Sequence, residues 1–120
     1  MSRRGAALLF VLLALGGLGW ARARARRPLR VDYYYIPYCM SCARVRHGLD
    51  GFAAHFGARV TVRTVDCFSA EGVAAAHKYG FVTHGIVVAD ADGQMLFEEK
   101  DHGVSADDVR VVVERELQKR

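Results

Sequence analysis

Hydrophobic positions along the chain alternate between the two-residue period of strands and the wider spacing of helices. Residues 29–36, LRVDYYYI, are aromatic and β-branched, and their apolar richness predicts an interior strand that is covered on both faces. Pro37 ends this strand. Apolar residues then recur at steps of four, three and four, which predicts one helix with a stripe formed by Val45, Leu49, Phe52 and Phe56.

The next segments repeat the change from strand to helix. In residues 58–66, Val60 and Val62 alternate with polar residues, which predicts a strand. Residues 69–80 are rich in alanine and end in Gly80, a pattern typical of a short helix with a glycine at its C-terminal end. Gly57 is expected to end the earlier helix in the same way.

The last third of the chain predicts a hairpin followed by a helix. Residues 85–90 and 93–100 read as two strands, because the Asp-Gly between two apolar runs is a strong hairpin signal. Ser105, with Asp108 three residues later, resembles a capping box. The helix that follows has an apolar stripe at Val109, Val112, Val113 and Leu117. The predicted order of elements is therefore β-α-β-α-β-β-α.

Residues 1–28 differ from the rest of the chain and predict an export signal. A short cationic head precedes an uncharged apolar run at 6–20, and candidate cleavage sites of the Ala-x-Ala type follow it, at Ala21/Ala23 or Ala23/Ala25. This run of about 15 residues is shorter than the roughly 20 that span a bilayer as a helix. A cleaved signal peptide is therefore favoured, with an uncleaved membrane anchor as the alternative.

The predicted location is extracytoplasmic, either periplasmic or secreted. One observation opposes it: the arginines after the apolar run outnumber Arg3 and Arg4 before it, and the positive-inside rule would then keep the domain in the cytoplasm.

Length and composition limit the chain to one small domain, because 120 residues with 52% hydrophobic content bury only a modest core. Six of the 17 Lys and Arg lie in residues 1–28, so residues 29–120 carry 11 against all 13 Asp and Glu. The domain is thus slightly acidic and has no basic patch with interleaved aromatic residues. Nucleic-acid binding has little support, and a monomer is expected.

Cys39 and Cys42 stand two residues apart between a predicted strand and a predicted helix. A cysteine in the first turn of a helix is stabilised as a thiolate by free backbone N–H groups and by the helix dipole. Cys39 is thus the expected attacking thiolate, and Cys42, one turn later and less exposed, is placed to resolve a mixed disulfide. A structural metal site with this spacing needs two further ligands, and only Cys67 and five scattered histidines remain.

Residues 29–120 resemble the thioredoxin family. The resemblance is carried by the strand that precedes Cys39-x-x-Cys42, the helix after it, VDC at 65–67, AAAHKYGF at 74–81, ADADG at 89–93 and Gly103. It implies a minimal thioredoxin-like α/β fold, with a central mixed sheet and helices on both faces. Together with the predicted export signal, it implies an exported thiol:disulfide oxidoreductase that needs no cofactor and uses Cys39 and Cys42 as a redox-active disulfide. The expected substrates are protein thiols or disulfides, with an unidentified redox partner.

The sequence departs from that family at three places. Met40-Ser41 stands between the cysteines where Gly-Pro is common, which leaves the direction of electron transfer undetermined. Tyr33 occupies the position of a buried acid that assists proton transfer in many members, and Asp32 is expected to point to the opposite face of the sheet. Gly85 stands where the family has a cis-proline, so a reshaped trans loop is expected there.

His84 and Cys67 are further candidates with two interpretations each. His84 precedes Gly85 and is predicted either to lie near Cys39 or to be a loop histidine in solvent. Cys67 ends its strand, at an edge where open α/β sheets place their sites, and the favoured interpretation is a buried, inert thiol. The alternative function is a metal-binding or metal-delivery module that uses Cys39, Cys42 and either His84 or Cys67. A redox-inert interaction domain is the third possibility.

Overall fold

The computed structural model describes residues 27–103 and 105–120, and its elements follow the predicted order. They are β1 (Leu29–Tyr35), α2 (Met40–Phe56), β2 (Val60–Asp66), α3 (Ala70–Tyr79), β3 (Gly85–Ala89), β4 (Met95–Lys100) and α4 (Ala106–Gln118), with short 3₁₀ turns at Gly57–Arg59 and Asp101–Gly103. The predicted signal peptide or anchor falls almost wholly within residues 1–26 and so lies outside the described residues. None of the helices that the structure describes is long and apolar enough to cross a membrane.

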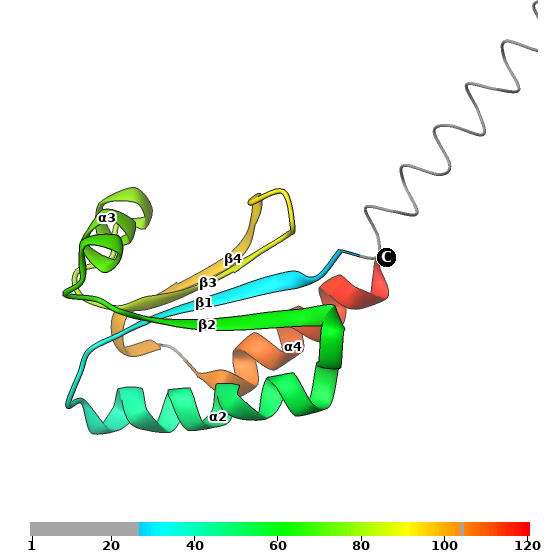
Figure 1. Ribbon diagram of the computed structural model, residues 1–120, viewed down its shortest axis with the longest axis horizontal. Helices are drawn as coiled ribbons and strands as arrows, with labels where there is room; N and C mark the ends of the chain where they lie inside the picture. Colours follow the sequence, from blue (N-terminus) through cyan, green and yellow to red (C-terminus); the bar gives the residue numbers. More distant parts are fainter. Residues whose placement is uncertain (1–26, 104) are drawn as a thin grey trace, which may run out of the picture.

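The four strands form one mixed sheet in the order β2-β1-β3-β4. β1 is parallel to β2 and antiparallel to β3, and β3 is antiparallel to β4. Helices α2 and α4 cover one face of this sheet and α3 covers the other (Figure 1). The predicted α/β architecture, with a central mixed sheet and helices on both faces, is confirmed.

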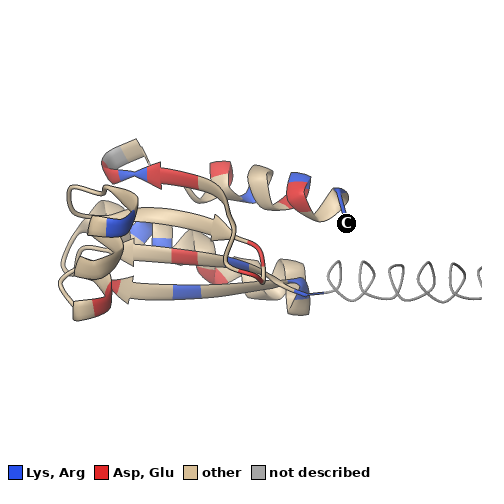
Figure 2. Ribbon diagram, turned by 90° about the horizontal axis from the view of Figure 1, so that it is seen from above, with Lys and Arg blue, Asp and Glu red and all other residues tan. Residues whose placement is uncertain are grey.

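The central strands are buried on both faces, as their apolar sequences predict. All five residues of β3 are buried, and β1 sends Leu29, Val31 and Tyr33 into the larger core under α2 and α4. Tyr34 belongs to a smaller core under α3. The edge strand β4 instead ends in Glu98, Glu99 and Lys100, and this charged end of an edge strand is visible in Figure 2. Charges on an edge strand oppose pairing with a further strand.

Helix ends follow the caps that the sequence predicts. Gly57 and Gly80 end α2 and α3 with φ of 57° and 71°, a region that glycine enters without steric cost. Ser105 begins α4, and its hydroxyl accepts a hydrogen bond from the backbone N–H of Asp107 at 3.2 Å. The hairpin between β3 and β4 is closed by the Asp90 carboxylate, which accepts from Asp92 N–H and from Gln94 N–H, both at 2.9 Å.

The two ends of the sheet have different roles. Arg120, at the C-terminus, donates a hydrogen bond to the carbonyl oxygen of Arg27 at 2.8 Å, so the described domain begins and ends at the same place. β1 runs from there to the opposite end, where the β1–α2 connection and the cysteine pair lie (Figure 1). The candidate site is therefore remote from residues 27 and 120.

Candidate functional site

The turn between β1 and α2 places Cys39 at the N-cap of the helix. Pro37 and Tyr38 form the turn, and Tyr38 adopts a left-handed φ of 66°. Cys39 then has extended backbone angles, φ −89° and ψ 119°, and its Sγ accepts a hydrogen bond from the backbone N–H of Cys42 at 3.4 Å. The sulfur thus takes the place that a serine or aspartate oxygen takes at most helix N-termini. The prediction that this helix begins at the cysteine pair is confirmed.

Hydrogen bonds to Cys39 favour its thiolate form. Its Sγ lies 3.0 Å from the Ser41 hydroxyl, and this contact lowers the pKa most. Hydrogen bonds with the side chain and the backbone N–H of Cys42 act in the same direction, and together they lower the pKa of Cys39 from 9.0 to about 7. Because the thiolate is the nucleophilic form of cysteine, about half of the Cys39 side chains are reactive near neutral pH.

Cys42 is buried, in contrast to Cys39. Its side chain is 2% exposed and packs in the core between β1 and the helices, whereas Cys39 is half-buried at the surface. The two side chains are within hydrogen-bonding reach of each other, and both are free thiols in this structure. A partner sulfur can therefore reach Cys39 from solvent but cannot reach Cys42.

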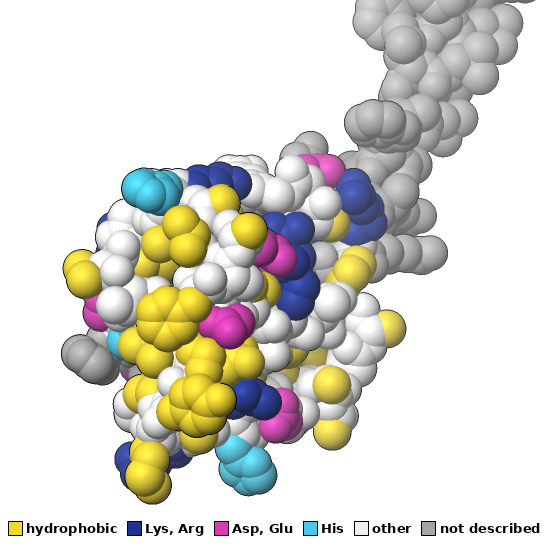
Figure 3. Space-filling view, turned by 60° about the vertical axis from the view of Figure 1, so that its left-hand side comes forward, with side chains coloured by type: hydrophobic (Ala, Val, Ile, Leu, Met, Phe, Trp, Pro, Cys, Tyr) yellow, Lys and Arg dark blue, Asp and Glu magenta, His cyan; other side chains and the backbone are white. Residues whose placement is uncertain are grey.

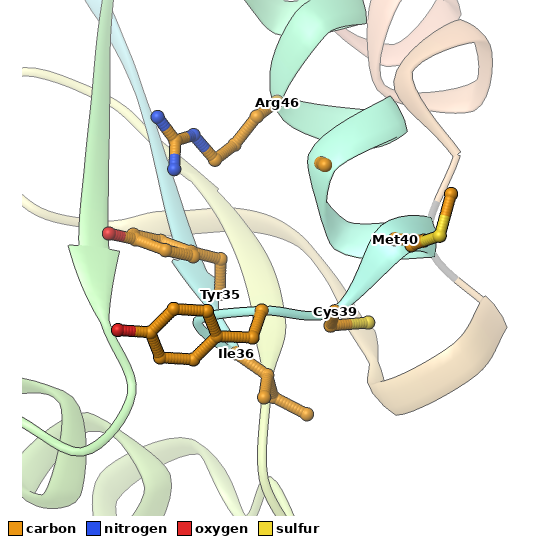
Figure 4. A pocket seen from close by; sticks show the side chains of 7 residues that line it. Tyr35, Ile36, Cys39, Met40 and Arg46 are labelled. Carbon is orange, nitrogen blue, oxygen red and sulfur yellow. The ribbon is translucent and has the colours of Figure 1, made fainter.

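A pocket of about 220 Å³ lies beside Cys39 (Figure 4). It is bounded by the end of β1 and the first two turns of α2. Arg46 extends from α2 over the ring of Tyr35, with the guanidinium carbon 4.6 Å from the ring centroid. This geometry is typical of a cation–π contact, which holds a positive charge at one wall of the pocket. The residues that line the pocket are Tyr35, Ile36, Tyr38, Cys39, Met40, Ala43 and Arg46.

Tyr33 is buried in the same core cluster as Cys42. Its side chain is 1% exposed. Burial is the largest cause that raises the pKa of Tyr33 well above its ordinary value of 10.0. The resemblance assigned Tyr33 to the position of a buried acid in the thioredoxin family, and the structure buries the tyrosine side chain at that position.

Asp32 points to the other face of the sheet, as predicted. Its carboxylate is 1% exposed and accepts hydrogen bonds from Arg30 Nε at 2.9 Å and from Arg63 Nε at 3.2 Å. Arg63 also forms an ion pair with Glu71 of α3. The hydrogen bond to Asp32 is the largest cause of the raised pKa of Arg63. Asp32 therefore belongs to an ionic cluster on the α3 face and does not serve the cysteine pair.

His84 and Gly85 do not line the pocket beside Cys39. His84 is 3% exposed, and its Nδ1 lies 2.9 Å from the Thr83 hydroxyl, so the interpretation as a solvent-exposed loop histidine is wrong. Gly85 begins β3 without a positive φ, and none of the described peptide bonds is cis. A Cβ at Gly85 would lie 2.5 Å from the ring of Phe81, so the ring occupies the space that any larger residue needs.

Cys67 is a buried thiol, in agreement with the favoured interpretation. It is 4% exposed, and its backbone N–H donates to the carbonyl oxygen of Tyr35 at 2.9 Å, which fixes it beside the end of β1. Burial is the main cause that raises its pKa. Cys67 also contributes to a second pocket of about 310 Å³, between the start of α3 and the loop before β3.

The metal alternative lacks a ligand set. Within residues 27–103 and 105–120, no three His, Cys, Asp or Glu side chains come close enough together to hold an ion. Cys39 and Cys42 are therefore only two potential ligands, because neither His84 nor Cys67 lies close enough to form a group of three with them.

Comparison with known proteins supports the fold. No family model matches the sequence, and no curated protein matches it significantly. Among solved structures, thioredoxin from Fasciola hepatica superposes with a TM-score of 0.61 at 20% identity, over 84% of this chain and 92% of that chain. Thioredoxin-2 of a malaria parasite gives 0.59 at 22% identity, over 73% and 82%. The Drosophila melanogaster thioredoxin Deadhead gives 0.60 at 14% identity, over 84% and 92%. The predicted thioredoxin-like fold is confirmed.

Proposed function

We propose that this protein is an exported thiol:disulfide oxidoreductase in which Cys39 and Cys42 alternate between a dithiol and a disulfide. The observation that carries the proposal is the asymmetry of the pair at the N-terminus of α2. Cys39 is accessible and its pKa is lowered to about 7, while Cys42 is buried one turn later and donates its backbone N–H to Cys39 Sγ. This is the arrangement that an attacking and a resolving cysteine need.

The reaction consists of two thiol–disulfide exchanges. In the reducing direction, the Cys39 thiolate attacks one sulfur of a substrate disulfide, and the other substrate sulfur leaves as a thiolate. Cys42 then loses its proton to water and attacks Cys39 Sγ, so that the Cys39–Cys42 bond forms and the mixed disulfide breaks. Two electrons pass from the dithiol to the substrate. Oxidation of a substrate dithiol follows the same steps in reverse, and a thiol or disulfide redox partner restores the starting state.

Proteins are the substrates that the surface near Cys39 favours. Large apolar side chains are exposed on this side of the molecule, which Figure 3 shows as a collection of apolar atoms. Exposed apolar patches of this kind mark sites of protein interaction. The exposed apolar side chains include Tyr38 and Met40, which flank Cys39 and line its pocket, and Phe68, Val73 and Val82, which line the second pocket beside α3.

Export is supported by the composition of residues 1–28. Arg27 lies at the end of the sheet opposite to Cys39 (Figure 1). A leader that stays uncleaved as an anchor would therefore leave the cysteine pair facing away from its point of attachment. Fractionation of cells that express the full chain, with mass spectrometry of the mature N-terminus, tests both export and cleavage.

The decisive experiment traps the covalent intermediate in the full-length chain. Cys42→Ser leaves an attacking thiol without a resolving one, so mixed disulfides with partner proteins should accumulate and be visible on non-reducing gels. Cys39→Ser should trap none, and Cys67→Ser is the matched control that should behave like the unmodified protein. If both Cys39→Ser and Cys42→Ser instead weaken binding of a soft metal ion equally, with no covalent adducts from either, the metal-binding alternative replaces this proposal.

A further inference from the structure

Arg46 is a charged side chain beside Cys39 that the proposed reaction does not use. It lies on α2 two turns after Cys39, is exposed, and lines the same pocket of about 220 Å³. Among the residues that the structure describes, no Asp or Glu forms an ion pair with Arg46, and no acceptor takes a hydrogen bond from its guanidinium. Arg63 and Arg110, in contrast, each pair with a carboxylate. The donors of Arg46 are therefore available to a group from outside the chain.

The ring of Tyr35 fixes the direction of this guanidinium. The guanidinium carbon lies 4.6 Å from the ring centroid, and Figure 4 shows the side chain extending from α2 towards Tyr35. A cation over the face of a ring is attracted through its charge and uses none of its N–H donors. Because this contact already orders the side chain, less conformational entropy is lost when an anion binds to it.

The charges on the helix side of the pocket are positive. Between residues 40 and 49, α2 carries Arg44 and Arg46 and no Asp or Glu, and its first acidic residue is Asp50. The N-terminus of a helix also carries partial positive charge. The acid opposite Tyr35 on β2, Asp66, accepts a backbone hydrogen bond at 2.8 Å and forms no ion pair with the arginine. A negative group on a substrate therefore meets an attractive potential here.

The spacing along α2 sets how far from the attacked sulfur that negative group must lie. Arg46 follows Cys39 by seven positions, which is about 10 Å along a helix axis. A peptide in an extended conformation covers about 3.3 Å per residue. The long side chains of arginine and of an acidic residue shorten the distance that the backbone must cover. An acidic residue two or three positions from the substrate cysteine therefore reaches Arg46 while the substrate sulfur lies at Cys39.

We infer, on the basis of the proposed function, that Arg46 is a specificity-determining residue that binds a carboxylate two or three residues from the attacked cysteine of a protein substrate. A guanidinium presents parallel N–H groups that match the two oxygens of Asp or Glu. The ion pair holds the substrate disulfide beside Cys39 during attack. The groups that lower the pKa of Cys39 are Ser41 and Cys42. Arg46 thus affects which disulfides react and not the reactivity of the thiol.

The test compares peptides that differ in a single charge. Each peptide carries one cysteine as a disulfide with thiopyridine, and one Glu or Gln at a fixed position from one to five residues away. In the reduced full-length chain, the Cys39 thiolate attacks the peptide sulfur, the bond to thiopyridine breaks, and thiopyridone leaves with a change in absorbance. At low ionic strength, Glu two or three residues away should give a second-order rate constant about three- to tenfold above that of Gln. At five residues the two should be equal.

Substitutions on α2 assign the preference to one side chain. Arg46→Gln should abolish the preference for Glu, leave the rate with Gln peptides unchanged and leave the alkylation midpoint of Cys39 where it is. Arg46→Glu should reverse the preference, so that peptides with Lys at the same positions react faster than those with Glu. Arg44→Gln is the matched control, because Arg44 is also exposed on α2 but does not line the pocket. It should keep the preference of the wild type.

The outcomes separate this inference from the proposed function. A wild-type protein that reacts with Gln peptides and then closes the Cys39–Cys42 disulfide, with equal rates for Glu and Gln at every position, overturns the role of Arg46 alone. Equal loss of the preference in Arg44→Gln also overturns it, because general positive potential would then account for the effect. If no peptide forms a disulfide with Cys39, or if Cys42 never displaces the peptide, the proposed function is contradicted. The comparison of Glu with Gln in the wild type decides even where a substitution disturbs the fold.

Discussion

Two cysteines follow neighbouring parallel strands at the same end of the sheet. Cys39 comes after β1 and Cys67 comes after β2. The strands are in register, with Tyr35 opposite Asp66, and the backbone of Cys67 is hydrogen-bonded to Tyr35. Their thiols nevertheless differ. Hydrogen bonds lower the pKa of Cys39 to about 7, whereas burial raises the pKa of Cys67.

The difference lies in which residue caps the helix that follows. Cys39 is itself the N-cap of α2, so its sulfur receives the backbone N–H that the first turn of a helix leaves free. In α3 the N-cap is Ser69, whose hydroxyl accepts from the Gly72 N–H at 3.1 Å. Cys67 stands two residues before that cap and receives no such donor from α3. Proximity to the end of a strand therefore does not decide which thiol is activated. Cys39 gains the Ser41 hydroxyl and the free N–H of its N-cap position, whereas Cys67 is buried and lies before the cap of its helix.

The largest expected effect is the difference in alkylation between these two cysteines. At neutral pH about half of Cys39 is thiolate, while burial raises the pKa of the Cys67 thiol, so Cys67 stays protonated and is also shielded from the reagent. Alkylation of Cys39 by iodoacetamide, followed by mass spectrometry, should be faster on the order of a hundredfold. The Cys39 rate should rise with pH and reach half of its maximum near pH 7, because the deprotonated form reacts.

Two outcomes of the alkylation experiment would contradict this comparison of Cys39 with Cys67. Rates within a few fold of each other for Cys39 and Cys67, in protein shown to be folded by circular dichroism, would mean that capping does not distinguish the two thiols. A Cys39 rate that still increases steeply above pH 9 would show that its pKa is not lowered.

Much of this arrangement was predictable because it depends on local pattern. The period of two in residues 58–66, the apolar stripe that ends at Phe56 and the glycines at helix ends predicted the elements in their order, which the structure confirms. The assignment of Cys39 to the first turn of a helix followed from the same pattern. Strand alternation also placed Asp32 and Tyr33 on opposite faces correctly.

The pattern could not predict the contacts that the ends of side chains make. Alternation assigns Tyr33 to a face but does not predict that it shares a core cluster with Cys42, because that depends on how closely α2 approaches β1. The hydrogen bond between Cys39 and Ser41 depends on rotamers that the spacing leaves open. His84 is buried, and its carbonyl oxygen accepts a hydrogen bond at 2.9 Å from the backbone N–H of Asp101, far along the chain; local pattern predicts neither.

A second way to test the comparison is to open the environment of Cys67. A Cβ at Gly72 would lie 2.3 Å from the carbonyl oxygen of Asp66 and 2.6 Å from Cα of Cys67. Gly72→Ala should therefore push α3 away from the end of β2, lower the free energy of unfolding by about 1 to 3 kcal/mol, and speed alkylation of Cys67 but not of Cys39. Urea denaturation and the alkylation assay measure the two effects.

The matched control for Gly72 is Gly51, which lies inside α2. A Cβ at Gly51 meets nothing within 4 Å, so only the helix propensity changes. Gly51→Ala should raise the free energy of unfolding by about 0.5 to 1 kcal/mol and leave both thiols as they are. If Gly72→Ala is as stable as Gly51→Ala, α3 does not pack against the end of β2 as closely as the structure shows.

The smallest expected effect concerns Ser41, the first cause of the lowered pKa of Cys39. Ser41→Ala removes the hydroxyl 3.0 Å from Cys39 Sγ but keeps the backbone N–H of Cys42 and a good helix former in the first turn. The alkylation midpoint of Cys39 should rise by about half a unit to one unit, so that three- to tenfold less thiolate is present relative to thiol.

Ser69→Ala is the control, because its hydroxyl caps α3 and touches neither sulfur of the pair. It should cost about 1 kcal/mol of stability and leave the Cys39 midpoint unchanged. A midpoint that does not move in Ser41→Ala would assign the activation of Cys39 to the helix N-terminus alone, and the comparison with Cys67 would then rest on the backbone of α2 without help from a side chain.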